Sequence, residues 1–144
     1  MHFKVYDLVD TGDDRGGLIP FEMGMNVPFE VARAFYIFNT RPGTARGSHA
    51  NRNSEFLFVV ISGSCNVKID NGVEQSVITL NRPNQALWLD KKVWKEMYDF
   101  SYNAILLVLS NEKYDEKEYI RDYGDYQRIL SADVFSGKVA DASS

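Results

Sequence analysis

The sequence predicts a single all-β domain, a jelly-roll barrel that ends in one or two short C-terminal helices. Roughly eight or more short apolar segments, separated by glycine, proline, asparagine and aspartate, recur at even spacing as far as Leu109. None of the segments between them has a helical pattern, and such a series of short strands is typical of closed barrels and jelly rolls. The chain of 144 residues is long enough to bury a core without metal or disulfides.

The N-terminal part of the chain supplies three predicted strands. Residues 3–9 form a short alternating segment, and the glycine-rich residues 11–17 form the turn that follows it. A second strand is predicted over residues 18–22. Residues 31–38 are rich in β-branched and aromatic side chains, which favour a strand.

The middle of the chain holds a glycine-broken turn, a histidine and an apolar strand over residues 56–61. Because side chains alternate between the two faces of a strand, His49, Asn51 and Glu55 are predicted to point to one face. In a barrel that face looks into the mouth, where antiparallel barrels hold small ligands. The chain has two histidines, and His2 lies at the N-terminus, so imidazole chemistry falls to His49.

The later strands follow from alternation and from one turn signal. Residues 65–70 alternate apolar and polar side chains, and residues 73–80 are their predicted partner. Asn71-Gly72 between them predicts a hairpin with a type I′ turn, in which both central residues have positive φ. Further strands are predicted over residues 86–89, 93–100 and 104–109, the last an apolar run that suits a strand buried on both faces.

The pattern changes after Tyr114. Residues 115–123 have helical character with Asp115 as the predicted N-cap, and a second short helix is predicted near residues 125–130. The sequence therefore predicts one domain over residues 1–135 and a flexible tail of small and polar side chains over residues 136–144.

Composition excludes several classes of partner. The net charge is −4, from 16 basic and 20 acidic residues, so no overall basic field indicates a nucleic acid. No apolar run approaches the ~20 residues of a membrane span, and the N-terminus lacks a signal-peptide core. Cys65 is the single cysteine, which rules out an intrachain disulfide and is compatible with a reducing compartment. A soluble cytoplasmic protein is expected.

One motif resembles the first signature of the cupin superfamily, with the spacing Gly43-x5-His49-x-Asn51-x3-Glu55-x7-Gly63. In metal-binding cupins two histidines and the glutamate join a later histidine around the metal. Here Asn51 stands at the second histidine position and Lys95 at the later one. An amide is a weak ligand for a transition metal and an ammonium has no lone pair. The resemblance therefore implies a cupin barrel with no metal and no other cofactor.

A closer resemblance extends over nearly the whole chain to about residue 130. The chain is similar to the sugar 3,4-ketoisomerases that act on dTDP-4-keto-6-deoxyglucose, a branch related to the dTDP-sugar 3,5-epimerase cupins. The matching pieces are Arg15-Gly16, Pro28-Phe29, Arg33-x-Phe35-Tyr36-Ile37-Phe38, Arg46-Gly47-x-His49-Ala50, Gly63-Ser64-Cys65, Val93-Trp94-x-Glu96-Met97-x-Asp99-Phe100 and Tyr114-Asp115-Glu116-x-x-Tyr119-Ile120-Arg121. The resemblance implies a homodimer with exchanged N-terminal strands and a product that supplies 3-amino-3,6-dideoxy sugars for surface polysaccharide.

The chemistry of such a reaction explains which side chains it needs. Moving a ketone from C4 to C3 of a hexose requires a base that removes the C3 proton, and an imidazole titrates in the right range. Donors facing the developing enolate oxygen stabilise it. By resemblance His49 is the base and Tyr36 a proton relay. Asn51 replaces the family's second histidine; its amide can hold an oxygen but does not titrate.

Substrate contacts are assigned to charged and aromatic side chains near the motifs. Arg46 is the first choice for the pyrophosphate, because a guanidinium offers two parallel donors. Arg33 and Arg41 are further candidates. Lys95, Trp94 and Glu96 belong to the stretch Trp-Lys-Glu-Met, where the family shows Trp-His-Glu-Met, and are predicted to contact the substrate.

Two alternatives remain at this point. A dTDP-sugar epimerase on the same scaffold would also begin by removing a proton beside a ketone, but would leave the ketone at C4. A nucleotide-sugar-binding cupin, catalytically impaired through Asn51 and Lys95, would bind the nucleotide and exchange no solvent deuterium into the sugar.

Overall fold

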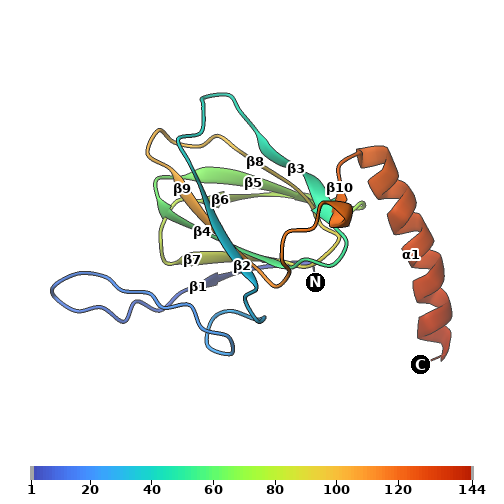
Figure 1. The fold of residues 1–144 in the computed structure, drawn as a ribbon, viewed down its shortest axis with the longest axis horizontal. Coiled ribbons are helices and arrows are strands. Elements are labelled where there is room, and N and C mark those ends of the chain that lie inside the picture. The colour runs from blue at the N-terminus through green and yellow to red at the C-terminus, as the bar shows by residue number, and fades with distance from the viewer. Residues whose placement is uncertain (1, 144) are drawn as a thin grey trace.

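A computed structural model describes the backbone of residues 2–143 and the side chains of residues 2–133. The described part forms one barrel-like body with a helix beside it and a loop that extends away from it (Figure 1). Its elements are β1 (Phe3–Asp7), β2 (Arg33–Phe38), β3 (Arg46–Asn51), β4 (Phe56–Ser62), β5 (Cys65–Asp70), β6 (Gln75–Leu80), β7 (Gln85–Leu89), β8 (Trp94–Tyr98), β9 (Ile105–Ser110), the 3-10 turn η1 (Glu116–Glu118), β10 (Tyr119–Ile120) and α1 (Tyr123–Ser143).

The strands form two antiparallel sheets that face each other. One has the order β1-β7-β4-β9-β2 and the other β10-β3-β8-β5-β6, so most neighbours are distant in the sequence. This arrangement confirms the predicted all-β jelly roll. It also places β3, which carries His49, directly beside β8, which carries Lys95.

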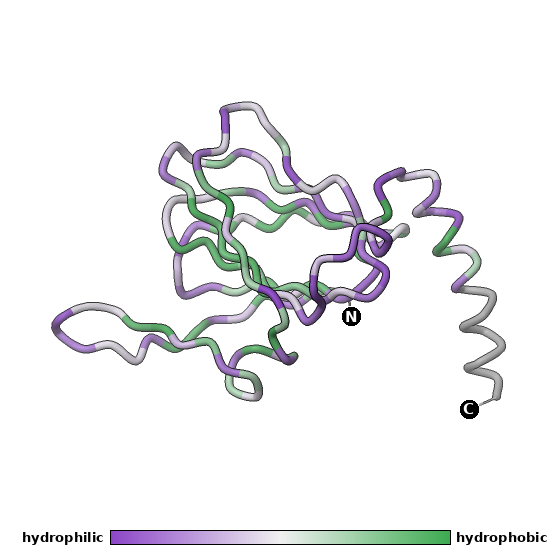
Figure 2. Tube along the Cα trace, in the orientation of Figure 1, coloured by the Kyte–Doolittle hydropathy of each residue, from purple (hydrophilic) through white to green (hydrophobic). Residues whose placement is uncertain are grey.

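The main core lies between the sheets, and a second apolar layer covers the outer face of the first sheet. Leu106 and Val108 of β9 belong to the main core, whereas Leu107 and Leu109 pack in the second layer. The prediction that this apolar run is buried on both faces is therefore confirmed. In Figure 2 the central strands are the most hydrophobic part of the tube.

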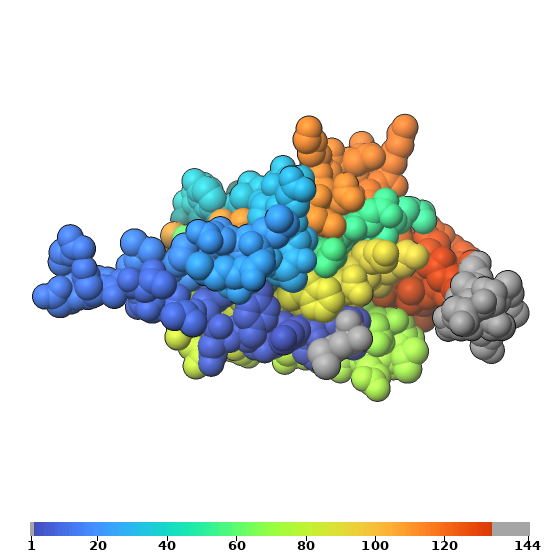
Figure 3. Space-filling view, turned by 90° about the horizontal axis from the view of Figure 1, so that it is seen from below, coloured from blue at the N-terminus to red at the C-terminus, as the bar shows by residue number. Residues whose placement is uncertain are grey.

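The segment between β1 and β2, residues 8–32, is called the N-terminal arm here. Its base contributes Leu8, Val27 and Phe29 to the second apolar layer, while its tip projects beyond the barrel (Figures 1 and 3). The strand predicted over residues 18–22 is wrong. The Leu18 carbonyl accepts from the Thr11 N–H at 2.7 Å and the Leu18 N–H donates to Asp10 Oδ1 at 2.8 Å, so the arm bonds to itself rather than to a sheet.

The hairpin between β5 and β6 forms as predicted, but its turn does not have the predicted type. Its loop contains four residues, because Asp70 pairs with Gln75. Gly72 has a positive φ of 92°, whereas Asn71 has none. The Asn71 side chain instead accepts from the backbone N–H groups of Val73 and Glu74 at 2.9 and 2.7 Å, which holds the longer loop closed.

The C-terminal region contains less helix before residue 122 than predicted and more after it. Asp115 is the N-cap, as expected, and accepts from the Lys117 N–H, but only the 3-10 turn η1 follows. Residues 119–120 then form β10, which pairs with β3. Helix α1 extends to Ser143 instead of stopping near residue 130. The predicted flexibility of residues 136–144 stays a prediction.

Two further expectations concern partners. Strand β1 pairs with β7 of its own chain over five residues, from Phe3↔Leu89 to Asp7↔Gln85, and the exchange of N-terminal strands between subunits stays a prediction. In the described residues no helix combines the length and the apolar character needed to cross a bilayer.

Candidate active site

A bulge in β3 aims His49 into the barrel. The register between β3 and β8 shifts between Gly47 and His49, and the intervening Ser48 has a positive φ of 57°. Gly47 itself has φ +88°, and a Cβ there would lie 2.9 Å from the Lys95 carbonyl oxygen. Glycine is therefore required where β3 passes β8 closely. Such bulges redirect side chains beside functional sites.

Behind the bulge lies a cavity of about 170 Å³. Its wall is mostly aromatic and aliphatic, with three basic side chains, and is formed by Phe35, Ile37, Arg46, Gly47, His49, Phe56, Phe58, Lys95, Met97, Val108 and Tyr119. A larger hollow of about 330 Å³ lies at the base of the N-terminal arm, where Lys4 is its one charged side chain. Of these two cavities, the one behind the bulge contains an imidazole, His49, together with a buried lysine, Lys95.

Lys95 is the most deeply buried charged group of this cavity. Its side chain leaves the residue 3% exposed, and Nζ donates to Asn51 Oδ1 at 3.0 Å and to the Val93 carbonyl at 3.3 Å. Nζ also lies 4.6 Å from the centroid of the Phe56 ring, a cation–π distance. Burial lowers the pKa of Lys95 to about 7, and the negative charge of Glu118 acts in the opposite direction. The ammonium can therefore lose its proton near neutral pH.

His49 lies opposite Lys95 on the neighbouring strand, with its ring 4.7 Å from the Tyr119 ring. Its pKa is lowered to about 4, first by burial and then by the positive charges of Lys95, Arg121 and Arg33, while a hydrogen bond with the Gly47 backbone raises it. The imidazole is consequently neutral at pH 7, and its pKa lies below the near-neutral range that the sequence predicted for the base.

Two arginines and two tyrosines form the rim around His49. Arg33 donates from a terminal guanidinium nitrogen to the Tyr119 hydroxyl at 3.2 Å and stacks near the Tyr114 ring at 5.5 Å. Arg121 lies 4.7 Å from the Tyr119 ring centroid. The rim is therefore cationic and planar, a surface suited to phosphate oxygens and aromatic bases.

The rim depends on the chain segment around η1. Buried Glu118 accepts from the Ser54 N–H at 2.7 Å, and its carbonyl accepts from the Arg52 N–H at 3.0 Å. These bonds hold β10 against β3 and so place Tyr119 beside His49. No role for Tyr119 or Arg121 is predicted from the sequence, because a strand of two residues is too short for alternation to show which face its side chains occupy.

The structure brings together four of the predicted site residues and puts a fifth on the rim. His49, Lys95 and Arg46 line the cavity, Asn51 bonds to Lys95, and Arg33 lies at the rim. Asn51 is 1% exposed, and its Nδ2 has no hydrogen-bond partner among the described residues. An unpaired buried amide donor is costly and is usually satisfied by a ligand or an ordered water.

Three predicted residues do not line the cavity, because their side chains lie on the opposite face of their strands. Tyr36 is 61% exposed, because its neighbours in β2, Phe35 and Ile37, occupy the cavity face and alternation turns Tyr36 outward. Trp94 and Glu96 alternate with Lys95 in the same way. The Trp94 ring packs against two tyrosines of α1, with centroids at 5.2 and 5.5 Å.

Two other residues lie apart from the cavity. Arg41 is exposed in the loop between β2 and β3 and does not line it. Glu55 was expected on the same face as His49, but its carboxylate accepts from Trp88 Nε1 at 3.0 Å and from the Asn111 amide. A bend at residues 52–53 interrupts the strand between His49 and Glu55, so alternation does not carry across it. Within the described residues no group of three or more His, Cys, Asp or Glu side chains is arranged to hold a metal ion.

Comparisons with known proteins agree with the geometry. Residues 1–131 match the protein family described as FdtA (WxcM-like, C-terminal). The chain is 37% identical over 131 residues to a TDP-4-oxo-6-deoxy-alpha-D-glucose-3,4-oxoisomerase from Aneurinibacillus thermoaerophilus, covering 91% of this chain and 94% of that protein.

Solved structures show the same likeness. A 3,4-ketoisomerase from Helicobacter canadensis is 40% identical with a TM-score of 0.88, over 91% of this chain and 98% of the other. The sugar 3,4-ketoisomerase QdtA from Thermoanaerobacterium thermosaccharolyticum, solved in complex with TDP, is 31% identical with a TM-score of 0.87, over 91% of this chain and 96% of the other.

Proposed function

Because this chain belongs to the FdtA family, we propose that it is a sugar 3,4-ketoisomerase, which converts TDP-4-keto-6-deoxyglucose to the 3-keto isomer. The observation that carries the proposal is the apolar cavity in which His49 of β3 lies opposite the buried Lys95 of β8. A neutral base and a nearby cation are what an enolate-forming reaction requires.

The cavity size supports a division of the substrate between cavity and rim. Pockets that enclose a whole drug-sized ligand measure roughly 300–1,000 Å³, whereas this cavity measures about 170 Å³. It therefore takes the sugar ring, and the diphosphate lies outside against the guanidinium groups. Arg46 and Arg33 are the proposed phosphate contacts, joined by Arg121.

The mechanism begins with His49. Its imidazole removes the C3 proton, and the charge that develops on O4 is stabilised by Lys95, the cationic donor of the cavity that is hydrogen-bonded to Asn51. The resulting enediol then receives a proton at C4 while O3 becomes the ketone. Each step uses side chains of this chain. The 3-keto product is the acceptor that an amino-transfer reaction needs, which supports a supply of 3-amino-3,6-dideoxy sugars for surface polysaccharide.

The proposed assembly and location of the protein follow from the same family membership. The proposed assembly is a homodimer, which is supported by exposed apolar side chains on β2, an edge strand: Tyr36 and Phe38 are 61% and 55% exposed, with rings 5.5 Å apart. The β1–β7 register can be made within one chain or with the β1 of a second copy, so exchange of this strand belongs to the proposal. A cytoplasmic location belongs to it too and is compatible with the free buried thiol of Cys65.

One incubation tests the proposed function. The purified protein is mixed with TDP-4-keto-6-deoxyglucose in D2O, and the sugar is followed by NMR. We expect the ketone to move from C4 to C3 and deuterium to enter the sugar. An epimerase would leave the ketone at C4, and a binding module would exchange no deuterium; either result contradicts the proposal.

A further inference from the structure

The proposed reaction moves protons on oxygen as well as on carbon, and one group in the cavity suits the oxygen transfers. O4 must gain a proton when C3 loses one, and O3 must lose its proton when C4 gains one. Asn51 is an amide and does not titrate. Lys95 does titrate, lines the cavity and is fixed at Nζ by two acceptors, Asn51 Oδ1 and the Val93 carbonyl.

We propose that Lys95 carries the proton between the two substrate oxygens, O4 and O3, and that Asn51 is the positioning residue that holds its amine in place. This inference rests on the proposed function. It assigns Lys95 a proton-transfer role instead of the binding role that the sequence predicted, and Asn51 a positioning role instead of a catalytic one.

The protons balance over the whole reaction. His49 takes the proton from C3 as the ammonium of Lys95 gives one to O4, which leaves an imidazolium, a neutral amine and the enediol. The imidazolium then gives its proton to C4, and the amine takes the proton from O3 as the C3–O3 double bond forms. Both side chains return to their starting states, and the substrate has gained and lost no electrons.

The electrostatics of the cavity favour this coupling. The positive charge of Lys95 is one of the causes that hold the pKa of His49 down to about 4. When Lys95 gives up its proton, that charge disappears and the imidazole becomes a stronger base at the moment it must accept a proton. The cavity carries one positive charge on this pair throughout, so the low-dielectric interior never holds two charges or none.

The hydrogen bonds around Lys95 leave room for a substrate oxygen. An ammonium has three N–H donors, and two acceptors bind it among the described residues. The face of the Phe56 ring lies on one side of Nζ. Asn51, which accepts from Lys95 through Oδ1, still has an unpaired and fully buried Nδ2. Lys95 therefore retains a third donor for a reacting oxygen.

The charged groups facing Lys95 set the expected pH dependence. His49 lies opposite on β3, Glu118 on η1 approaches from the end of β10, and Arg46 lines the same cavity. Catalysis needs Lys95 protonated and His49 neutral at the start. Because the pKa of Lys95 is about 7 and that of His49 about 4, we expect kcat to fall above neutral pH and again in acid.

The first test separates charge from proton transfer. Lys95→Arg keeps a positive charge that does not titrate, and Lys95→Ala removes it. We expect Lys95→Arg to lower the isomerisation rate at least ~10²-fold while C3–H exchange with D2O in the 4-keto sugar falls less than ~10-fold. Lys95→Ala is expected to lose both isomerisation and C3–H exchange, and to regain isomerisation when ethylamine is added. Lys91→Ala, an exposed lysine nearby, is the matched control and keeps wild-type activity.

The second test uses Asn51 and does not depend on replacing the buried lysine. Asn51→Leu removes an acceptor of the ammonium, so the pKa of Lys95 falls further, and we expect the alkaline limb of the kcat profile to move down by about one pH unit. The acid limb, which reports His49, is expected to stay. A merely structural role for Asn51 would lower the rate without moving either limb, and that result overturns its positioning role.

The outcomes distinguish this inference from the proposed function. If the wild-type protein does not move the ketone, the proposed function fails. If the wild type moves it and Lys95→Arg isomerises within about threefold of the wild-type rate, the function stands and the role of Lys95 is wrong. Circular dichroism identifies a variant that fails to fold, in which case the Asn51→Leu profile decides.

Discussion

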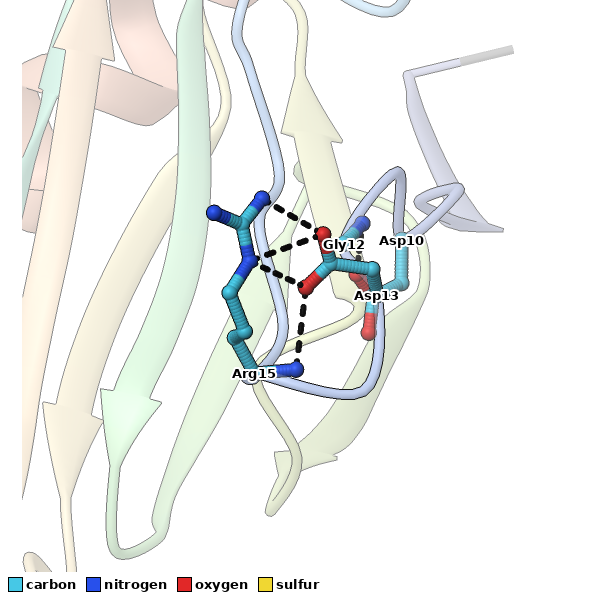
Figure 4. Close-up of polar contacts among 4 residues, drawn as sticks. All are labelled: Asp10, Gly12, Asp13 and Arg15. Carbon is cyan, nitrogen blue, oxygen red and sulfur yellow. Dashed lines mark hydrogen bonds and ion pairs between the residues drawn. The ribbon is translucent and has the colours of Figure 1, made fainter.

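The cavity behind the bulge of β3 and the tip of the N-terminal arm each hold a basic side chain beside a polar partner. Their surroundings shift the pKa values of these two basic side chains in opposite directions. In the cavity, Lys95 is 3% exposed and burial lowers its pKa to about 7. In the arm, the side chain of Arg15 is 88% exposed and pairs with Asp13, which raises the pKa of Arg15 and lowers that of Asp13 (Figure 4). Only the buried group can exchange a proton near neutral pH.

The arm nevertheless has defined geometry. Asp13 accepts from the Arg15 backbone N–H at 2.9 Å and from its guanidinium at 2.6–3.1 Å, and Asp10 accepts from the Gly12 N–H at 2.8 Å (Figure 4). Hydrogen bonds of short range thus shape a segment that has no core of its own. The difference teaches that hydrogen bonding between exposed partners favours the charged forms of both side chains, whereas removal of water in the cavity favours the neutral form of Lys95.

The largest expected effect separates the two histidines of the chain. Replacing His49 with Asn removes the proposed base and is expected to lower isomerisation at least ~10²-fold, the lower range for a positioned acid–base group. The measurement is the rate of 3-keto product formation by NMR. His2→Asn is the matched control, since His2 lies outside the cavity and is expected to retain the wild-type rate. Comparable losses in both variants would contradict the role of His49.

A second prediction concerns how the buried Lys95, unlike an exposed basic side chain, makes the free energy of unfolding depend on pH. In the unfolded chain Lys95 has its ordinary pKa of 10.5, whereas in the folded chain the value is about 7. Between these values the unfolded state binds more protons, so the free energy of unfolding rises with pH. We expect a gain of about 2 kcal/mol from pH 7 to pH 9, measured by urea denaturation.

The measurement ends at pH 9 because the titration of Cys65 lowers the free energy of unfolding at higher pH. Burial raises the pKa of the Cys65 thiol from 9.0 to about 11, so its contribution to stability is lost progressively as pH rises above 9. The control variant is Lys95→Met, in which the rise between pH 7 and pH 9 is expected to vanish. A rise of equal size in that variant would show that another group causes it.

Sequence reasoning predicted the fold more fully than the site. Apolar runs and alternation identify β4, β5 and β9, because burial on one or both faces leaves a direct pattern in the side chains. The register between strands leaves no such pattern. The bulge at Ser48, the bend before Glu55 and the pairing of β10 with β3 decide which residues meet, and each depends on contacts distant in the sequence.

The same reason explains the individual differences between the predicted and the observed positions. Tyr36 and Trp94 stand in strands that were correctly identified, but a shift of one position moves a side chain to the opposite face. Strand 18–22 was wrong because Asp10 and Thr11, eight and seven residues before Leu18, complete the hydrogen bonds of the arm. Tyr119 and Arg121 join the site only through Glu118, whose partner Ser54 lies 64 residues away.

The smallest expected effect applies one chemical change to both regions. Asp13→Asn and Glu118→Gln each replace a carboxylate with an amide of the same shape. Glu118 is 7% exposed and accepts from the Ser54 N–H in the buried segment that faces Lys95. We expect Glu118→Gln to lower Tm by at least about 3 °C, because a buried charged hydrogen bond is weakened.

Asp13→Asn is expected to change Tm by less than about 1 °C, because exposed ion pairs contribute little to stability and water replaces the lost contacts. Thermal melts at low salt and at 1 M NaCl measure both variants. Salt screens exposed charges, so the small effect in the arm should disappear at 1 M while the effect of Glu118→Gln persists. Equal shifts in the two variants at both salt concentrations would break the comparison, since burial would then not be what separates the charges of the cavity from those of the arm.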